Sequence, residues 1–361
     1  MKVALVTESL WGMGGANRVL EHFCEIYPQA DIYSIFGSKK SISKKISEHS
    51  ITFSILNRLP FVRKIYRYTY FLWPLAVENF NLSNYDLVIS SSSCVAHGVI
   101  TDLHTKHICY LHSPMRYAWD LSNLYFKKEN FSLWKRIVIP IFLNYLRIWD
   151  VVASQRPNVL ISNSNFVKKR VQKYWDREVD FVLNPPVKLF KGVVKKERKN
   201  YFVAGAPFEF NKRGDFLLDR AVELGFNLKL IGTGSLFKKY KRKYDRYSNI
   251  EFLGYVSEKE KIDIFLNAKG FLMAGIEDFG IFPIEALSCG TPIFVANTGS
   301  ISEYLIEGVN GLSFKYDSKE SFEISIEKFI KKKWDYLKIS KTASRFDEKN
   351  FVEKFEEIAK E

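Results

Sequence analysis

The chain has 361 residues, of which 47% are hydrophobic, and a formal net charge of +14. This length suits two domains of moderate size, each able to bury a core of its own. The positive charge favours anionic partners such as phosphates or an anionic membrane surface, whereas nucleic acid is not expected, because no RNP-type, KH or zinc-knuckle motif is present.

Cysteine and histidine usage gives no sign of a disulfide framework or a metal site. No CxxC pair occurs, so we expect reduced, buried thiols in a cytoplasmic protein at Cys24, Cys94, Cys109 and Cys289. The histidines lack zinc-type spacing, so no metal is expected. No run of eighteen uncharged apolar residues occurs, so no spanning helix is expected. Glu8 interrupts the first apolar run too early for a signal peptide.

The first half of the chain alternates short apolar runs with helical patterns. Lys2–Thr7 predicts a buried strand, Gly14 and Gly15 a loop, and the apolar residues from Val19 to Ile26 a helix. This succession is typical of the opening of an α/β unit. Further strands are predicted over residues 30–36, 86–90, 107–111, 159–162 and 180–183, in a mostly parallel sheet.

A basic stretch without a periodic pattern, residues 188–200, follows Asn184-Pro185-Pro186 and marks a domain boundary. The N-terminal domain is therefore predicted over 1–187 and the second over 188–346. The second domain repeats the α/β pattern, with a helix over 215–224 and strands over 201–206, 227–231, 250–252, 270–274 and 292–296. An amphipathic helix over about 347–361 carries Phe351, Phe355 and Ile358 on one side.

The segment from Gly275 to Pro292 carries the clearest chemistry. A strand ends at Gly275, Pro283 suits the first turn of a helix, and Gly290 suits its left-handed cap. Glu277 is then expected on the loop and Glu285 in the first helical turn. The N–H groups of residues 279–282 would bind a diphosphate, and the two carboxylates could hold sugar and ribose hydroxyls. The alternative is a solvated Glu277 and a Glu285 that only complements the helix dipole.

Several motifs agree in type and order with one family. They are GMGGANRV at 12–19, LHSPMRYAWD at 111–120, ISNSNFV at 161–167, NPPV at 184–187, EDFGIFPIE at 277–285 and EGVNGL at 307–312. Together they resemble the retaining GT-B glycosyltransferases of the fourth family, with its E-x7-E signature, and especially bacterial O-antigen mannosyltransferases.

The resemblance implies a GT-B architecture of two Rossmann-like domains facing across a cleft, with the C-terminal helix packed back on the first domain. The first domain would bind a glycan or lipid-linked acceptor and the second a nucleotide-sugar, with GDP-mannose favoured over a UDP-hexose or deoxysugar nucleotide. The reaction implied is metal-independent and retaining hexosyl transfer in cell-surface polysaccharide assembly, without a further cofactor.

The same resemblance assigns roles to individual residues. Glu277 and His112 would be catalytic, with Glu277 stabilising charge and His112 contacting the transferred sugar. Donor-binding residues would be Gly14, Gly15, Lys212, Arg213, Phe279, Gly280, Ile281 and Glu285. Arg116 would contact acceptor or phosphate, or else form a surface pair with Asp120.

One position departs from the family pattern. The family's diphosphate-binding Lys is present as Lys212, but the Arg five residues earlier is replaced by Pro207. Arg213 could substitute for it. The departure keeps open the alternative of a non-catalytic GT-B subunit of a polysaccharide-assembly complex. A GT-B sugar-nucleotide epimerase, which would need no acceptor, is a second alternative.

Residues 58–80 mix bases with aromatic rings. Arg58, Arg63, Lys64 and Arg67 alternate with Phe, Tyr and Trp residues. Such a segment could bind anionic headgroups at a membrane surface, or form a buried helix with a basic outer face. With the first reading, the protein would be cytoplasmic and peripheral on the inner face of the cell membrane.

Overall fold

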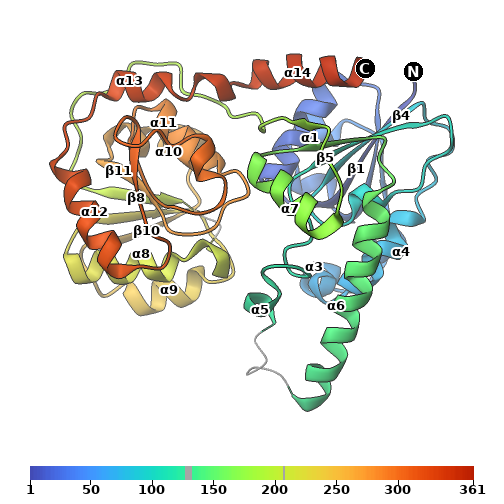
Figure 1. The fold of residues 1–361 in the computed structure, drawn as a ribbon, viewed down its shortest axis with the longest axis horizontal. Helices are drawn as coiled ribbons and strands as arrows, with labels where there is room; N and C mark the ends of the chain where they lie inside the picture. The colour runs from blue at the N-terminus through green and yellow to red at the C-terminus, as the bar shows by residue number, and fades with distance from the viewer. Residues whose placement is uncertain (127–131, 206–207) are drawn as a thin grey trace. The chain divides into compact units, whose positions relative to one another are not determined.

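Parallel strand pairing organises both halves of the chain. The computed structural model describes residues 1–126, 132–205 and 208–361, so Pro207 lies outside the described residues. Two compact units result: one of Met1–Asn184 with Phe351–Glu361, the other of Pro185–Asn350 (Figure 1). The chain thus enters the second unit close to the boundary expected at residue 188.

The first unit contains a seven-stranded parallel sheet in the order β3-β2-β1-β4-β5-β6-β7. Its strands are β1 Val3–Leu10, β2 Asp31–Gly37, β3 Ile51–Phe53, β4 Leu87–Ser92, β5 Lys106–Leu111, β6 Val159–Ser162 and β7 Phe181–Val182. All but β3 correspond to predicted strands. The order reverses between β1 and β4, which makes the carboxyl ends of these two strands a switch point.

The first unit also contains helices, some of which extend away from the sheet (Figure 1). They are α1 Gly15–Ile26, α2 Lys44–Ser47, α3 Val62–Ile65, α4 Trp73–Glu78, α5 Ser122–Tyr125, α6 Leu133–Ser154, α7 Asn165–Trp175 and α14 Glu348–Lys360. Residues 58–80 do not form one helix, because α3 and α4 are separated by two 3-10 turns, Tyr66–Tyr68 and Tyr70–Leu72. Trp73 and Phe80 of this segment are buried, whereas Phe61 and Tyr68 are exposed.

The C-terminal helix α14 belongs to the core of the first unit. Its Phe351, Phe355 and Ile358 are buried with Phe23 of α1 and Tyr110 of β5. The rings of Phe23 and Phe355 lie 4.5 Å apart between centroids.

The second unit has a six-stranded parallel sheet in the order β10-β9-β8-β11-β12-β13. Its strands are β8 Phe202–Gly205, β9 Leu228–Ile231, β10 Ile250–Gly254, β11 Gly270–Met273, β12 Ile293–Ala296 and β13 Gly311–Phe314. Its helices are α8 Gly214–Leu224, α9 Phe237–Tyr244, α10 Glu258–Asn267, α11 Ile281–Ser288, α12 Lys319–Lys331 and α13 Tyr336–Lys341. Strand β13 was not predicted. The order reverses between β8 and β11, which is the switch point of this sheet.

All four cysteines are buried and form no disulfide, as expected. The expectation that no helix spans a membrane stays a prediction. Among the described residues, one stretch of α6, Arg136–Ser154, is long and apolar enough to cross a membrane, by length and composition alone, and 28% of it is buried. A search for uncharged runs passes over it, because the stretch contains Arg136, Arg147 and Asp150.

Removal of the Phe355 ring tests whether α14 stabilises the first unit. Phe355 is fully buried, so Phe355→Ala should lower the free energy of unfolding by about 3–5 kcal/mol through lost burial and a residual cavity. Lys354→Ala, at an exposed position of the same helix, should change it by less than about 0.5 kcal/mol. Equal effects in urea unfolding would contradict this account.

Candidate functional site

Lys212 and Glu277 form an ion pair at the switch point of the second unit. Lys212 ends the 3-10 turn Phe210–Lys212 that follows β8, and Glu277 lies on the loop after β11. Lys212 Nζ donates to Glu277 Oε2, with both side chains about four-fifths buried. Neighbouring strands thus bring together two predicted site residues that are far apart in the sequence.

A glycine permits the close approach of these two loops. A Cβ atom at Gly275 would lie 2.4 Å from Lys212 Cα, nearer than real Cβ contacts allow. The adjacent Ile276 N–H donates to the Asn211 carbonyl at 3.1 Å. Any larger residue at position 275 would therefore separate Lys212 from Glu277.

A third segment holds the backbone of the Glu277 loop. Ser300 N–H donates to the Glu277 carbonyl at 3.1 Å, and Ser300 Oγ donates to the Phe279 carbonyl at 2.7 Å. Gly280, with φ +94°, then starts α11 in a left-handed conformation. The Phe279, Gly280 and Ile281 backbone therefore leads into the N-terminus of α11 beside Glu277, as predicted.

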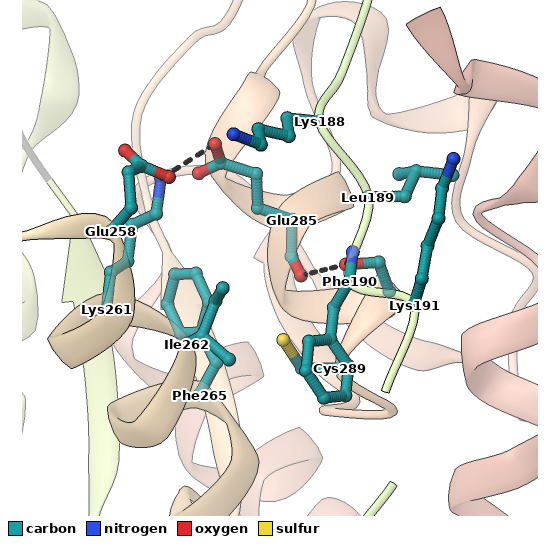
Figure 2. Close-up of a pocket in the computed structure, with 11 residues that line it drawn as sticks. Lys188, Leu189, Phe190, Lys191, Glu258, Lys261, Ile262, Phe265, Glu285 and Cys289 are labelled. Atoms are coloured by element: carbon teal, nitrogen blue, oxygen red, sulfur yellow. Dashed lines mark hydrogen bonds and ion pairs between the residues drawn. The ribbon is translucent and has the colours of Figure 1, made fainter. Parts of the chain in front are cut away.

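The prediction that Glu285 lies in the first turn of the helix is wrong. Helix α11 begins at Ile281, so Glu285 is in its second turn. Glu285 is 4% exposed, and its Oε1 lies 2.8 Å from Lys261 Nζ of α10. Lys261 also lies 3.0 Å from Glu258 Oε2, so the three charges form a chain between the two helices (Figure 2).

These residues line a pocket with a volume of about 170 Å³. Figure 2 shows its walls, which are α10, α11 and the extended segment Lys188–Lys191. Ser288 Oγ accepts a hydrogen bond from Phe190 N–H at 3.1 Å and fixes that segment on α11. The volume suits only part of a nucleotide-sugar. Lys188 and Lys261 were not predicted here, because the linker showed no pattern and Lys261 lies on a helix with other charges.

Arg213 is directed away from Lys212 toward other acids. It precedes α8 with φ +51°, and its NH2 donates to Asp317 Oδ1 at 2.8 Å, while its Nε lies 3.6 Å from Asp215 Oδ1. The hydrogen bond with Asp317 raises the pKa of Arg213 and lowers that of Asp317. A phosphate would have to compete with Asp317 for this guanidinium.

The glycine loop of the first unit lies where it was predicted. Gly14 is the N-cap of α1, and in the part of the chain that the structure describes, no atom beyond its chain neighbours lies within 4 Å of a Cβ built there. Asn17 holds the loop, because its Nδ2 donates to the carbonyls of Ser9 at 2.9 Å and Gly12 at 2.6 Å. Gly14 and Gly15 therefore border open space at the end of β1.

His112 follows β5 at the same sheet edge and is half-buried. Its Nε2 lies 2.9 Å from Ser91 Oγ, and its backbone N–H donates to the Ser92 carbonyl at 2.7 Å. Close by in sequence, the Asp120 carboxylate accepts from Arg170, so the proposed i,i+4 partner of Arg116 is engaged by another arginine.

Glu8 is a polar residue of this edge that the sequence analysis missed. Its Oε1 accepts from the N–H groups of Cys94, Val95 and Ala96 at 2.9 Å each, and its Oε2 accepts from Ser93 Oγ at 3.1 Å. A concave set of N–H groups of this kind attracts anions. Here the Glu8 carboxylate occupies this set of N–H groups. In the sequence, the one indication of the arrangement is an acidic residue within an otherwise apolar strand.

The structure thus brings Lys212, Glu277 and the start of α11 together in the second unit, and places Glu285 in a side pocket. Gly14, Gly15 and His112 share an edge of the first unit. Across residues 1–126, 132–205 and 208–361, no group of three or more His, Cys, Asp or Glu is placed to hold a metal ion.

Comparison with known proteins agrees with these observations. The chain is similar over 99% of its length to the lipopolysaccharide outer core galactosyltransferase WaaB, covering 98% of that structure with a TM-score of 0.65 and 18% identity. It is also similar to HepE of Anabaena in complex with UDP and glucose, over 100% of this chain and 99% of the other, with a TM-score of 0.66 and 16% identity. With its two parallel sheets, the chain therefore has the GT-B fold.

Two further comparisons each match part of the chain. Residues 188–350 match the family model "Glycosyl transferases group 1", which covers less than half of the chain. An uncharacterized glycosyltransferase of Methanocaldococcus jannaschii is 32% identical over 152 residues, or 39% of this chain. That alignment spans 43% of the relative's length.

Proposed function

We propose that the protein is a glycosyltransferase that moves a hexose from a nucleotide-sugar to a glycan or lipid-linked acceptor in cell-surface polysaccharide assembly. The observation that carries this proposal is the Lys212–Glu277 pair beside the N-terminus of α11, at the switch point of the unit that matches the group 1 glycosyl transferases. Ligands of open α/β sheets bind at such points.

The local charges suit a diphosphate leaving group. Lys212 and the N–H groups at the start of α11 would stabilise the developing negative charge without a metal or further cofactor. Glu277 would stabilise positive charge at the anomeric carbon as its bond to phosphate breaks. In the retaining reaction proposed, the acceptor oxygen bonds to the same face and its proton passes to the leaving phosphate.

The donor base and sugar are part of the proposal. The HSPMRYAWD motif supports GDP-mannose. The solved HepE complexes contain UDP, glucose or UDP-glucose, which supports a nucleotide-sugar as the class of ligand and makes UDP-hexoses the first competitors to test. Glu285, in its pocket, is assigned to the ribose.

The two glutamates should differ in kinetic effect. Glu277→Gln removes a charge that is worth more in the transition state than before it, so kcat should fall on the order of a hundredfold with little change in donor affinity. Glu285→Gln should mainly raise the donor KM. Steady-state kinetics, calorimetry with donor and thermal unfolding are measured together, because Glu285 also pairs with Lys261 inside the fold.

Normal kcat with lost donor binding in Glu277→Gln would reverse the assigned roles. Parent-like behaviour of both variants, in a protein without turnover, would favour the non-catalytic subunit.

Donor consumption with and without acceptor separates the remaining alternatives. Turnover should require an acceptor and should survive EDTA, because the proposed phosphate ligands are protein groups. Interconversion of the donor sugar without acceptor would indicate an epimerase. Loss of turnover in EDTA, restored by magnesium or manganese, would contradict the metal-independent mechanism.

We also propose that the protein is cytoplasmic and peripheral on an anionic membrane, with residues 58–80 at the surface. Arg63 and Lys64 of α3 are exposed beside the exposed ring of Phe61. Arg63→Ser with Lys64→Ser should weaken binding to anionic vesicles, and added salt should do the same. The matched pair Lys238→Ser with Lys239→Ser, exposed on α9, should not. Equal binding to neutral and anionic vesicles would refute an electrostatic contribution.

A further inference from the structure

The outward face of α6 is apolar along its whole length. Residues at spacings of three and four lie on one face of a helix. On α6 such a set forms a line that we name the α6 stripe, with exposed fractions of 61% at Trp134, 67% at Ile137, 63% at Ile141, 39% at Tyr145, 59% at Ile148 and 58% at Val152. At 1.5 Å per residue the stripe is about 27 Å long. An exposed helix face is ordinarily polar.

The opposite face of α6 packs against the rest of the first unit. Leu143, Leu146 and Ala153 are buried there. Asp150, also fully buried, accepts hydrogen bonds through Oδ2 from Trp119 Nε1 at 2.7 Å and Trp175 Nε1 at 2.6 Å. The helix therefore cannot rotate to hide the stripe, and it could cross a membrane only by breaking these contacts.

The two segments that meet at Phe71 and Phe142, residues 58–80 and 133–154, each hold more basic than acidic residues. Within residues 133–154 the only acid is Asp150, and within 58–80 the only acid is Glu78, which lies 2.7 Å from Arg156 and accepts from Trp149. Both acids are thus engaged by neighbouring side chains. Exposed bases are Arg58, Arg63, Lys64 and Arg136.

Residues 58–80 and α6 contact each other. The rings of Phe71 and Phe142 lie 5.1 Å apart, and Trp149 Nε1 of α6 donates to Glu78 Oε1 of α4 at 2.8 Å. A second copy of the chain would bring two cationic surfaces together, which opposes association. An anionic bilayer attracts the same cations and accepts the apolar side chains below its headgroups.

We propose that α6 lies in the plane of an anionic phospholipid bilayer, with the α6 stripe inserted at the boundary of headgroups and acyl chains. Trp134 and Tyr145 would sit at that boundary, where such rings are favoured. The inference extends the proposed electrostatic contact of residues 58–80 to an apolar anchor. It does not depend on glycosyl transfer, because vesicle binding is measured without turnover.

The test uses the full chain with Ile137→Ser, Ile141→Ser and Ile148→Ser combined. Partition onto phosphatidylcholine–phosphatidylglycerol vesicles should fall at least about tenfold, because three inserted apolar side chains are lost. Thermal unfolding should be unchanged, since these side chains are already exposed. The matched control, Ile324→Ser with Ile330→Ser, removes side chains of the second unit that are 51% and 50% exposed and should bind like the parent.

The depth at which the α6 stripe inserts into the bilayer is measured in a second experiment. Lipids brominated on the acyl chain should quench the tryptophan fluorescence of the parent, and Trp134→Phe should reduce that quenching. Parent-like vesicle binding of the triple variant, an equal loss in the control, or no binding of the parent would overturn the proposal. The parent could instead sediment as a dimer and the triple variant as a monomer, with no vesicle binding by the parent. That result would assign the stripe to contact with a second copy of the chain.

Discussion

Both halves of this chain depend on parallel strand pairing, which places the carboxyl ends of the strands along one edge of each sheet. Polar residues can gather there without entering the apolar core between sheet and helices. In the second unit this edge brings Lys212, after β8, to Glu277, after β11. In the first unit it brings Glu8 of β1 to the turn after β4. In each case the meeting point is where the strand order reverses.

The two switch points differ in their charge. In the first unit, the N–H groups of residues 93–96 already bind the Glu8 carboxylate, so this position repels rather than attracts a further anion. In the second unit, a lysine and the start of α11 supply positive potential, and the acid beside them lies on a loop that glycines allow to approach. This asymmetry supports binding of an anionic diphosphate by the second unit.

The sequence was sufficient where a pattern is local. Most buried strands and the glycine loop before α1 each follow from neighbouring residues. The sequence was insufficient where tertiary contacts determine whether an element forms, where it begins and which side chains pair. Strands β3 and β13 are short and only partly buried, so their apolar signal is weak. Glu285 was placed one turn too early because the helix start depends on Gly280, whose conformation is fixed by the surrounding segments. Lys212 was predicted from the resemblance, but its ion pair with Glu277, like that of Lys261 with Glu285, joins different elements and has no local signal in the sequence.

The sequence was also insufficient for helix α6, because composition alone does not tell which face of a helix is buried. Its inner face holds a carboxylate, and burial raises the pKa of Asp150 to about 7. His97, 3.4 Å away, is kept neutral, because burial lowers its pKa to about 3. The indole N–H groups of Trp119 and Trp175 bind this carboxyl group and offset part of the cost of burying it. The outer face of α6 carries the exposed apolar side chains of the α6 stripe, for which water is a poor solvent and which the proposed lipid contact would remove from water.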